Sequence, residues 1–319
     1  QFFVTNFGFP SMKLSLDDFS AARKRLFPYI RKTPHMDITL DNGQEVVLKL
    51  ENMQLSGSFK IRGALNTVLG LEKEALEKGL VTASGGNHGM GVAIAGQLTR
   101  TPATIYLPEN TPASKIEKLQ KHASNVIVSG PVWDDANALA LKAAEEEGMT
   151  YVHPFADRSV IEGQGTIALE ILEAAPSLDI LMVAIGGGGL ISGIASAAKF
   201  LNPDIRIIGI EAEGAPTLYE SCRAKELITL EKIDTRAGTL APRRSAEPNL
   251  EIISEKVEEI ILISDADMEA AYHWLWQSAG IATELSAAAA IGALRSGKFK
   301  PGTSDKVGVV ICGAGYDGF

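Results

Sequence analysis

Short apolar runs alternate along the chain with longer segments in which apolar residues recur every three or four positions. The short runs predict strands over 45–51, 80–83, 103–107, 125–128, 151–153, 180–185, 205–210, 258–263 and 306–311. The longer segments predict helices over 58–71, 87–99, 114–122, 134–147, 161–173, 190–201, 267–278 and 284–295. A further helix begins near Ser15. This strand–helix alternation predicts an α/β fold whose mostly parallel sheet is covered by helices on both faces.

The length of the chain adds a second level of organisation. At 319 residues it exceeds the usual domain of about 100–150 residues, so we expect two lobes around a cleft. Residues 1–11 precede Met12 and are interpreted as a leader or an expression remnant outside the fold. The irregular stretch 232–250 is longer than an ordinary connection, which favours a lid or a loop at the functional site.

Composition and charge favour small-molecule chemistry. Apolar residues make up 45% of the chain and charged residues 22%, as in a folded, soluble enzyme. The formal net charge of −9 disfavours nucleic acid and anionic membranes as partners, and no apolar run approaches the roughly 18 residues of a membrane span. Cys222 and Cys312 are too few for a disulfide framework, so a reducing cytoplasm is the simplest location, with a single bridge left open.

A single lysine stands between a predicted strand and a predicted helix. The segment SGSFKIRGA, residues 56–64, places Lys60 at the helix start, where the positive end of the helix dipole disfavours a cation. This position lowers the pKa of the amine, and a partly deprotonated amine is the nucleophile that a Schiff base requires. The alternative is an ordinary solvated lysine.

Two glycine-rich segments follow predicted strands and open predicted helices. The main-chain N–H groups of ASGGNHGMG, residues 83–91, suit a bound carboxylate, and Asn87 adds both a donor and an acceptor. The main-chain N–H groups of AIGGGGLISG, residues 184–193, suit a bound phosphate. This segment lacks the sequence motifs of nucleoside triphosphate and dinucleotide sites. The alternatives are tight packing for the glycines and a structural role for His88.

The last predicted strand also ends in small residues. VVICGAGYDGF, residues 309–319, places Cys312 at the tip of that strand. Ligands of open α/β sheets bind beyond the carboxyl ends of the strands, so Cys312 is a candidate for the same site as Lys60 and the two glycine turns. A buried and inert thiol is the alternative.

These four segments, in this order, resemble the fold-type II pyridoxal-phosphate enzymes of the serine/threonine dehydratase and serine racemase branch. The resemblance extends from about Leu14 to the C-terminus. It implies two domains, each an open, mostly parallel sheet flanked by helices, as in the tryptophan synthase β-like fold. The large cofactor-binding domain would comprise 12–74 and 154–319, and the small domain 75–153. It also implies pyridoxal 5'-phosphate as cofactor, an amino-acid substrate and a homodimer.

The resemblance implies a role for each matching residue. Lys60 would hold the cofactor as a Schiff base, with Phe59 beside the ring. Asn87 would bond the phenolic O3′ and Cys312 would face the pyridine nitrogen. Glu284, in GIATELSAAAA, would lie near the cofactor, although the usual Glu-Pro of the family is Glu-Leu here. The phosphate would be bound by the N–H groups of Gly186, Gly187, Gly188, Gly189 and Leu190. The substrate carboxylate would be held by Ser84, Gly85, Asn87 and His88.

The implied reaction is elimination of water from a β-hydroxy amino acid such as L-threonine or L-serine, which gives a 2-oxo acid and ammonia. A thiol at the pyridine nitrogen makes the cofactor a weaker electron sink and disfavours long-lived carbanions. Racemases of this branch carry a serine two residues before the asparagine, where this chain has Gly85, and racemisation needs a second acid–base group. A racemase, a β-replacement synthase and a non-catalytic pyridoxal-phosphate-binding protein are the alternatives.

Two further features stay open. GIEAEGAPT, residues 209–217, aligns with the cation loop of the family: Glu211 and the Ala215 carbonyl match ligands of a mono- or divalent cation, but Thr217 replaces an acidic ligand. Arg243 and Arg244 lie in the long irregular stretch, and we favour a surface position for them over contact with a distal carboxylate of the substrate.

Overall fold

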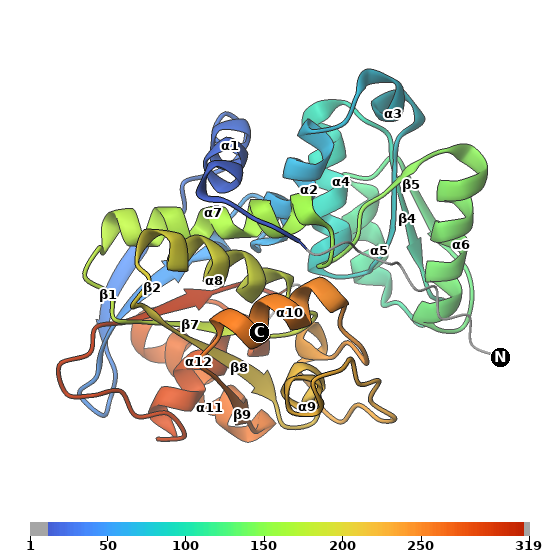
Figure 1. Ribbon diagram of the computed structural model, residues 1–319. Coiled ribbons are helices and arrows are strands. Elements are labelled where there is room, and N and C mark those ends of the chain that lie inside the picture. The colour runs from blue at the N-terminus through green and yellow to red at the C-terminus, as the bar shows by residue number, and fades with distance from the viewer. Residues whose placement is uncertain (1–11, 316–319) are drawn as a thin grey trace.

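The computed structural model describes residues 12–315. The interpretation of residues 1–11 as a leader or remnant therefore lies outside the described part of the chain, as do residues 316–319. Two separate sheets are present, one of six strands and one of four, and Figure 1 shows them in two lobes.

The larger lobe contains the six-stranded sheet, in the order β1-β2-β10-β7-β8-β9. Its strands are β1 (His35–Thr39), β2 (Glu45–Leu50), β7 (Ile180–Ala184), β8 (Arg206–Ala212), β9 (Glu259–Ile263) and β10 (Val307–Ile311). Only the β1–β2 pair is antiparallel within this sheet. Every residue of the two central strands β7 and β10 is buried, as expected for parallel strands that are covered on both faces.

Helices cover both faces of the larger sheet (Figure 1). One face carries α7 (Arg158–Ala174) and α8 (Gly189–Leu201), and the other carries α11 (Asp265–Ala279) and α12 (Leu285–Arg295). The remaining elements of this lobe are α1 (Leu16–Leu26), η1 (Glu51–Met53), α9 (Thr217–Ala224), η2 (Gly238–Leu240) and α10 (Glu247–Lys256). Ser15 caps α1 through a reciprocal pair of bonds with Asp18, which confirms the helix expected to begin there.

The smaller lobe contains a parallel sheet in the order β5-β4-β3-β6. Its strands are β3 (Leu80–Ala83), β4 (Ala103–Leu107), β5 (Asn125–Val128) and β6 (Thr150–Tyr151), and its helices α2 (Lys60–Leu69), α3 (Lys73–Lys78), α4 (Asn87–Thr99), α5 (Ala113–Gln120) and α6 (Trp133–Glu147). Successive residues of β3 belong to different cores: Leu80 packs with residues of α4, whereas Val81 packs with Ala140 and Ala143 of α6. The alternation of strand side chains therefore places α4 and α6 on opposite faces.

Helix α2 joins the two lobes. Its side chains Ile61, Leu65 and Val68 belong to the core that includes β3 and α4, while the helix also contacts α7 of the larger lobe. We predicted that residues up to 74 belong to the large domain, and the packing of α2 joins it to the smaller sheet as well. The domain boundaries stay a prediction.

The predicted α/β fold is confirmed, and the differences are local. Strand β1 and helices α3, α9 and α10 were not predicted, and β6 begins before and ends short of the predicted 151–153. The stretch 232–250 is mainly irregular, but it includes η2 and the start of α10, which has a proline in its first turn. None of the helices in the described residues is both long and apolar enough to cross a membrane.

Candidate active site

Lys60 is the first residue of α2 and lies beside the end of β10. The Phe59 N–H donates to the Cys312 carbonyl at 3.0 Å, and the Ala314 N–H donates to the Gly57 carbonyl at 2.8 Å. These two bonds hold the lysine segment against the last strand. The Lys60 Nζ lies 5.2 Å from the centroid of the buried Phe59 ring and donates to the Pro154 carbonyl at 2.7 Å.

The Lys60 amine has an unusually low proton affinity. Burial lowers its pKa from 10.5 to about 8, and the nearby Glu284 carboxylate opposes this effect. The low pKa that we expected is therefore present, with burial as its main cause. An amine of this kind is partly deprotonated near neutral pH, as a nucleophile or a general base requires.

Asn87 and Glu284 meet next to Lys60. The Asn87 Nδ2 donates to both carboxylate oxygens of Glu284, at 2.9 and 3.0 Å, and the Glu284 N–H donates to the Gly313 carbonyl at 3.1 Å. The Asn87 Oδ1 is buried and has no hydrogen-bond partner in the described residues. A buried acceptor without a partner is costly, so Asn87 is suited to accept a hydrogen bond from a bound hydroxyl group.

Cys312 is buried at the end of β10 and stays a thiol. Burial first, and then the Glu284 carboxylate, raises the pKa of the Cys312 thiol far above its usual range. Such a group is neutral at physiological pH and is a poor nucleophile. It can accept or donate only a weak hydrogen bond.

The glycine turn at the start of α8 has unused donors. None of the main-chain N–H groups of residues 186–190 donates to another group in the described part of the chain. Gly188 has a φ of +92°, which favours glycine. A side chain at Gly186 would lie 2.6 Å from the Thr239 carbonyl, and side chains at Gly187 and Gly189 would overlap Phe155. The glycines are therefore required for packing, and the turn they form suits an anion.

The loop before α4 presents a second set of unused donors. The N–H groups of Gly85, Asn87 and His88 have no partner in the described residues. The His88 ring, in contrast, turns away into the smaller lobe, where its Nε2 lies 2.9 Å from the Val152 carbonyl and 3.1 Å from the Thr82 Oγ1. Burial, with a smaller effect of Lys60, lowers the pKa of His88 to about 3, so its ring is neutral. A ligand at this loop would therefore be bound by main-chain N–H groups and not by the imidazole of His88.

The segment from His153 to Phe155 joins these parts, and the sequence did not single it out. The Pro154 carbonyl accepts the Lys60 bond, and Phe155 packs against Gly187 and Gly189. Asn249, also unpredicted, donates from its Nδ2 to the Gly187 carbonyl at 2.8 Å and to the Phe155 carbonyl at 3.2 Å. The available signal was that this segment begins at the end of the predicted strand 151–153, because ligands bind at such strand ends.

A buried ionic cluster anchors α2 at Arg62, two residues beyond Lys60. Arg62 donates to Glu51 at 2.7 and 2.8 Å and to Glu170 at 2.7 and 3.0 Å. Lys49 donates to Glu170 at 2.6 Å, so two cations face two carboxylates. All four side chains are buried, and the cluster connects α2 to β2, η1 and α7. Paired buried charges of this kind fix the position of the lysine-bearing helix.

The predicted cation ligands are already engaged in hydrogen bonds. Both Glu211 oxygens accept N–H groups at the start of α9, from Leu218 at 2.9 Å and Tyr219 at 2.8 Å. The Ala215 carbonyl accepts the Thr217 N–H at 2.9 Å, and the Thr217 hydroxyl donates to the Pro242 carbonyl at 2.6 Å. No cluster of three His, Cys, Asp or Glu side chains able to hold a metal occurs in residues 12–315.

Arg243 and Arg244 are exposed. Arg243 donates to the Leu230 carbonyl at 2.9 Å, and Arg244 donates to the Leu227 carbonyl at 2.9 Å. These bonds hold the arginines on the surface of the long irregular stretch. This agrees with the surface position that we favoured.

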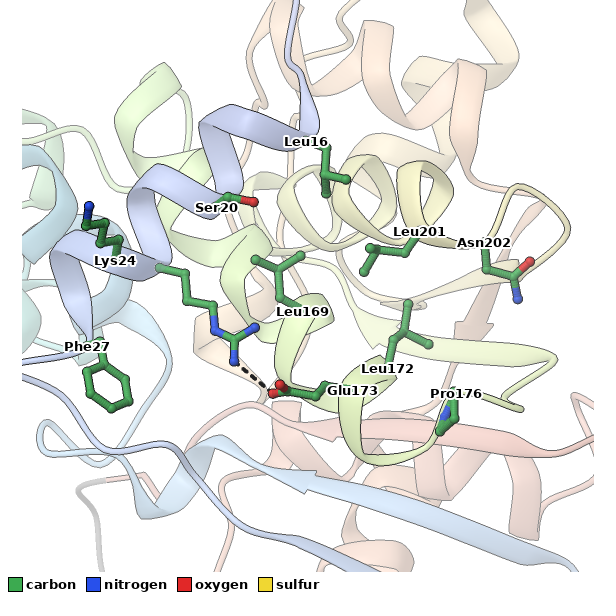
Figure 2. A pocket seen from close by; sticks show the side chains of 11 residues that line it. Leu16, Ser20, Lys24, Phe27, Leu169, Leu172, Glu173, Pro176, Leu201 and Asn202 are labelled. Atoms are coloured by element: carbon green, nitrogen blue, oxygen red, sulfur yellow. Dashed lines mark hydrogen bonds and ion pairs between the residues drawn. The ribbon is translucent and has the colours of Figure 1, made fainter.

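A pocket of about 690 Å³ lies elsewhere, between α1 and the C-terminal ends of α7 and α8 (Figure 2). Aliphatic side chains such as Leu169 and Leu172 line it, and Arg23 pairs with Glu173 at 2.8 Å beside them. It shares no lining residue with the predicted site. We therefore place the chemistry at the start of α2, α4 and α8 instead.

The fold and these loops define a class of protein. Residues 26–313 match the family described as pyridoxal-phosphate dependent enzyme, and the chain belongs to this family. The resemblance inferred from the sequence is thereby confirmed.

Particular relatives are similar over almost the whole chain. The chain is 36% identical to an L-threonine ammonia-lyase of Thermotoga maritima, over 95% of this chain and 76% of the relative. It is 39% identical to the catabolic L-threonine dehydratase TdcB of Staphylococcus aureus, over 89% and 84%. Among solved structures, maize serine racemase superimposes with a TM-score of 0.91 at 35% identity, over 95% of this chain and 94% of the other.

The residues at the site fit pyridoxal phosphate. The unused N–H groups of 186–190 suit its phosphate, and the unpartnered Asn87 Oδ1 suits its phenolic hydroxyl. The neutral Cys312 thiol suits the pyridine nitrogen, and Lys60 has the reactive amine. The individual contacts of the predicted site residues stay a prediction.

Proposed function

We propose that this protein is an ammonia-lyase that removes water from a β-hydroxy amino acid of the L-threonine or L-serine type. Relatives named as threonine ammonia-lyase and threonine dehydratase support this proposal. The observation that carries it against the racemase alternative is Gly85, because glycine has no side chain to donate a proton at the position where racemases of this branch carry a serine.

The net reaction balances without an outside oxidant or reductant. The amino acid loses its α-proton and its β-hydroxyl group, which leave together as one water molecule. Hydrolysis of the resulting unsaturated amine consumes one water molecule and releases ammonia and a 2-oxo acid. When bound, pyridoxal phosphate supplies the electron sink that makes the α-proton removable.

The chain's own residues position the substrate and move the proton. The N–H groups of Gly85, Asn87 and His88 bind the α-carboxylate at the N-terminus of α4. The Lys60 Nζ takes the α-proton, because its pKa of about 8 leaves part of the amine unprotonated at neutral pH. The Pro154 carbonyl, 2.7 Å from this nitrogen, orients the amine.

A racemase is the second candidate, and relatives of that name support it. Racemisation needs a proton delivered from the face opposite Lys60. A Cβ added at Gly85 would lie 3.2 Å from the Thr111 Cγ2, 3.5 Å from the Leu107 Cδ2 and 3.8 Å from the Thr111 Oγ1, so these three nearest atoms include one hydroxyl group and no ionisable group.

One experiment separates these reactions. Purified protein receives L-threonine or L-serine without any thiol, and ammonia, 2-oxo acid and the inverted isomer are measured together. We expect the oxo acid to form at least about 100 times faster than the inverted isomer, the lower range of the benefit from a positioned acid. Gly85→Ser should raise the racemised share, and Gly85→Ala provides the same Cβ without a hydroxyl group.

Three outcomes would refute the proposal. Wild-type protein that inverts the α-carbon as fast as it releases ammonia is a racemase. Wild-type protein that consumes the amino acid only after a thiol is added, and forms a thioether that keeps the amino group, is a β-replacement enzyme. Protein that binds the cofactor without any turnover is a carrier.

The oligomeric state and the cellular location complete the proposal. We propose a homodimer, to be tested by light scattering during size-exclusion chromatography. We also propose a cytoplasmic location, which the two free thiols of Cys222 and Cys312 support and cell fractionation would test.

A further inference from the structure

His153 lies at the carboxyl end of the smaller sheet, next to the substrate loop. Strands β3 and β6 pair in parallel with Leu80 opposite Thr150 and Val81 opposite Tyr151. The Val152 N–H donates to the Val81 carbonyl at 3.0 Å, which continues this register. His153 follows Val152 directly, so it lies at the carboxyl end of this sheet, the same end as the loop that begins at Ser84.

The structure fixes the tautomer of the His153 ring. Its Nδ1 lies 2.9 Å from the Ala156 N and 3.2 Å from the Phe155 N, and both of these groups are donors. Nδ1 must therefore be the unprotonated acceptor, and the proton of the neutral ring is on Nε2. The Phe155 ring packs edge-on against the imidazole at 4.7 Å and holds it in place.

The Nε2–H group is available for a ligand. No described residue accepts a bond from it, although the ring is only partly exposed. The next residue, Pro154, accepts the bond from Lys60. Burial and the Lys60 ammonium lower the pKa of His153 to about 3, so the ring is a neutral donor rather than an acid.

We propose that His153 is a substrate-binding residue whose Nε2–H donates to the α-carboxylate of the amino acid. The carboxylate lies against the N–H groups at the start of α4, and His153 adds one donor from the adjacent strand end. This inference rests on the proposed function for the location of the substrate, but not on which reaction follows. A bond to the β-hydroxyl group is the competing possibility that the experiment excludes.

Two substitutions separate the two ring nitrogens. His153→Asn places a side-chain oxygen near the position of Nδ1, so it keeps the acceptor for Phe155 and Ala156 and removes the Nε2–H donor. His153→Gln places an N–H group near the position of Nε2 and loses the acceptor. His122→Asn is the matched control, because His122 is bound to Gln97 on the surface of the smaller lobe.

The test measures the affinity of the holoenzyme for L-alanine, which has a carboxylate but no β-hydroxyl group. Binding is followed through the absorption of the bound cofactor, and the cofactor's own affinity and the melting temperature are measured in parallel. We expect His153→Asn to weaken alanine binding by about tenfold or more, as for the loss of a hydrogen bond to a charged group. Its cofactor affinity should stay within about twofold of the wild type, and His153→Gln should bind alanine more tightly than His153→Asn.

Unchanged alanine affinity in His153→Asn would overturn the proposal. So would a defect confined to turnover of serine or threonine, because it would assign the donor to the hydroxyl group. If wild-type protein binds alanine in a His153-dependent way but releases no ammonia from any hydroxy amino acid, the lyase proposal fails and this one stands.

Discussion

The unprotonated fraction of Lys60 should set the rate at which the protein acquires its cofactor. The amine that attacks pyridoxal phosphate must be free of its proton. Because burial lowers the pKa of Lys60 to about 8, the protein already contains a reactive fraction at neutral pH. The variable to change is therefore the pH at which the cofactor-free protein is mixed with pyridoxal phosphate.

The size of the effect follows from the two pKa values. At pH 7, a pKa of about 8 leaves about 9% of the amine unprotonated, whereas the ordinary 10.5 leaves about 0.03%, a ratio of about 300. The rate of covalent attachment should rise about tenfold per pH unit below pH 8 and become nearly constant above it. A lysine with an ordinary pKa would continue to accelerate up to about pH 10.

Stopped-flow absorbance between pH 6 and 10 measures this profile. Borohydride reduction followed by peptide mass spectrometry identifies the modified residue, and Lys60→Ala is the control that should lose the adduct. Glu284→Gln tests the cause, because the Glu284 carboxylate raises the pKa of Lys60 and its removal should move the break to lower pH. A profile that still rises tenfold per unit at pH 9.5, or a break that moves upward in Glu284→Gln, would refute the reasoning.

Three further outcomes are expected. Arg62→Met removes the buried cation that pairs with Glu51 and Glu170, so the free energy of unfolding of the cofactor-free protein should fall by about 3–5 kcal/mol in urea titrations. A loss below about 1 kcal/mol would contradict the anchoring role. Gly187→Ala places a methyl group 2.2 Å from the Phe155 Cδ1, so the turn must shift and cofactor affinity in equilibrium dialysis should drop by at least about tenfold. An unchanged affinity would remove the phosphate role from this turn. Both Glu211 oxygens accept main-chain hydrogen bonds from α9, so excess chelator or added Mg²⁺ should change lyase activity by less than about twofold. A larger response would reveal a functional cation.

The alternation of apolar runs was sufficient to predict every strand of the two sheets except the edge strand β1. Strands β7 and β10 are apolar at every position because both faces are covered. Strand β1, with the sequence HMDIT, lies at the edge of the sheet, and none of its side chains is fully buried. An edge strand of mixed polarity has no clear pattern, so its pairing with β2 became visible only in the structure.

Helix α10 shows a different limit of sequence interpretation. Its sequence begins EPNL, and these residues fall in the stretch 232–250 that we predicted to be irregular. Proline is tolerated in the first turn of a helix, where its missing N–H has no intrahelical partner to lose. Asn249, inside this helix, donates hydrogen bonds to the Gly187 and Phe155 carbonyls, which lie 62 and 94 residues away in the sequence.

The glycine turn shows that two explanations from sequence need not exclude each other. Phosphate binding and tight packing were opposed as alternatives for Gly186 to Gly189. In the structure, Phe155 and Thr239 leave no room for side chains at three of these positions, and the same turn leaves a row of N–H groups without partners in the described residues. Close packing of the neighbouring segments is what keeps the turn in the shape that suits an anion.

The two histidines near Lys60 explain why a motif alone could not identify the binding imidazole. His88 was selected because it lies within SGGNHG, but its Nε2 is bound to the Val152 carbonyl inside the smaller lobe. His153 lies outside every motif, and its Nδ1 is held by the main chain while its Nε2 has no partner in the described residues. Both rings are buried enough to have pKa values near 3, so their charge does not distinguish them. The difference is which ring nitrogen already has a hydrogen-bond partner in the fold: Nε2 in His88 and Nδ1 in His153.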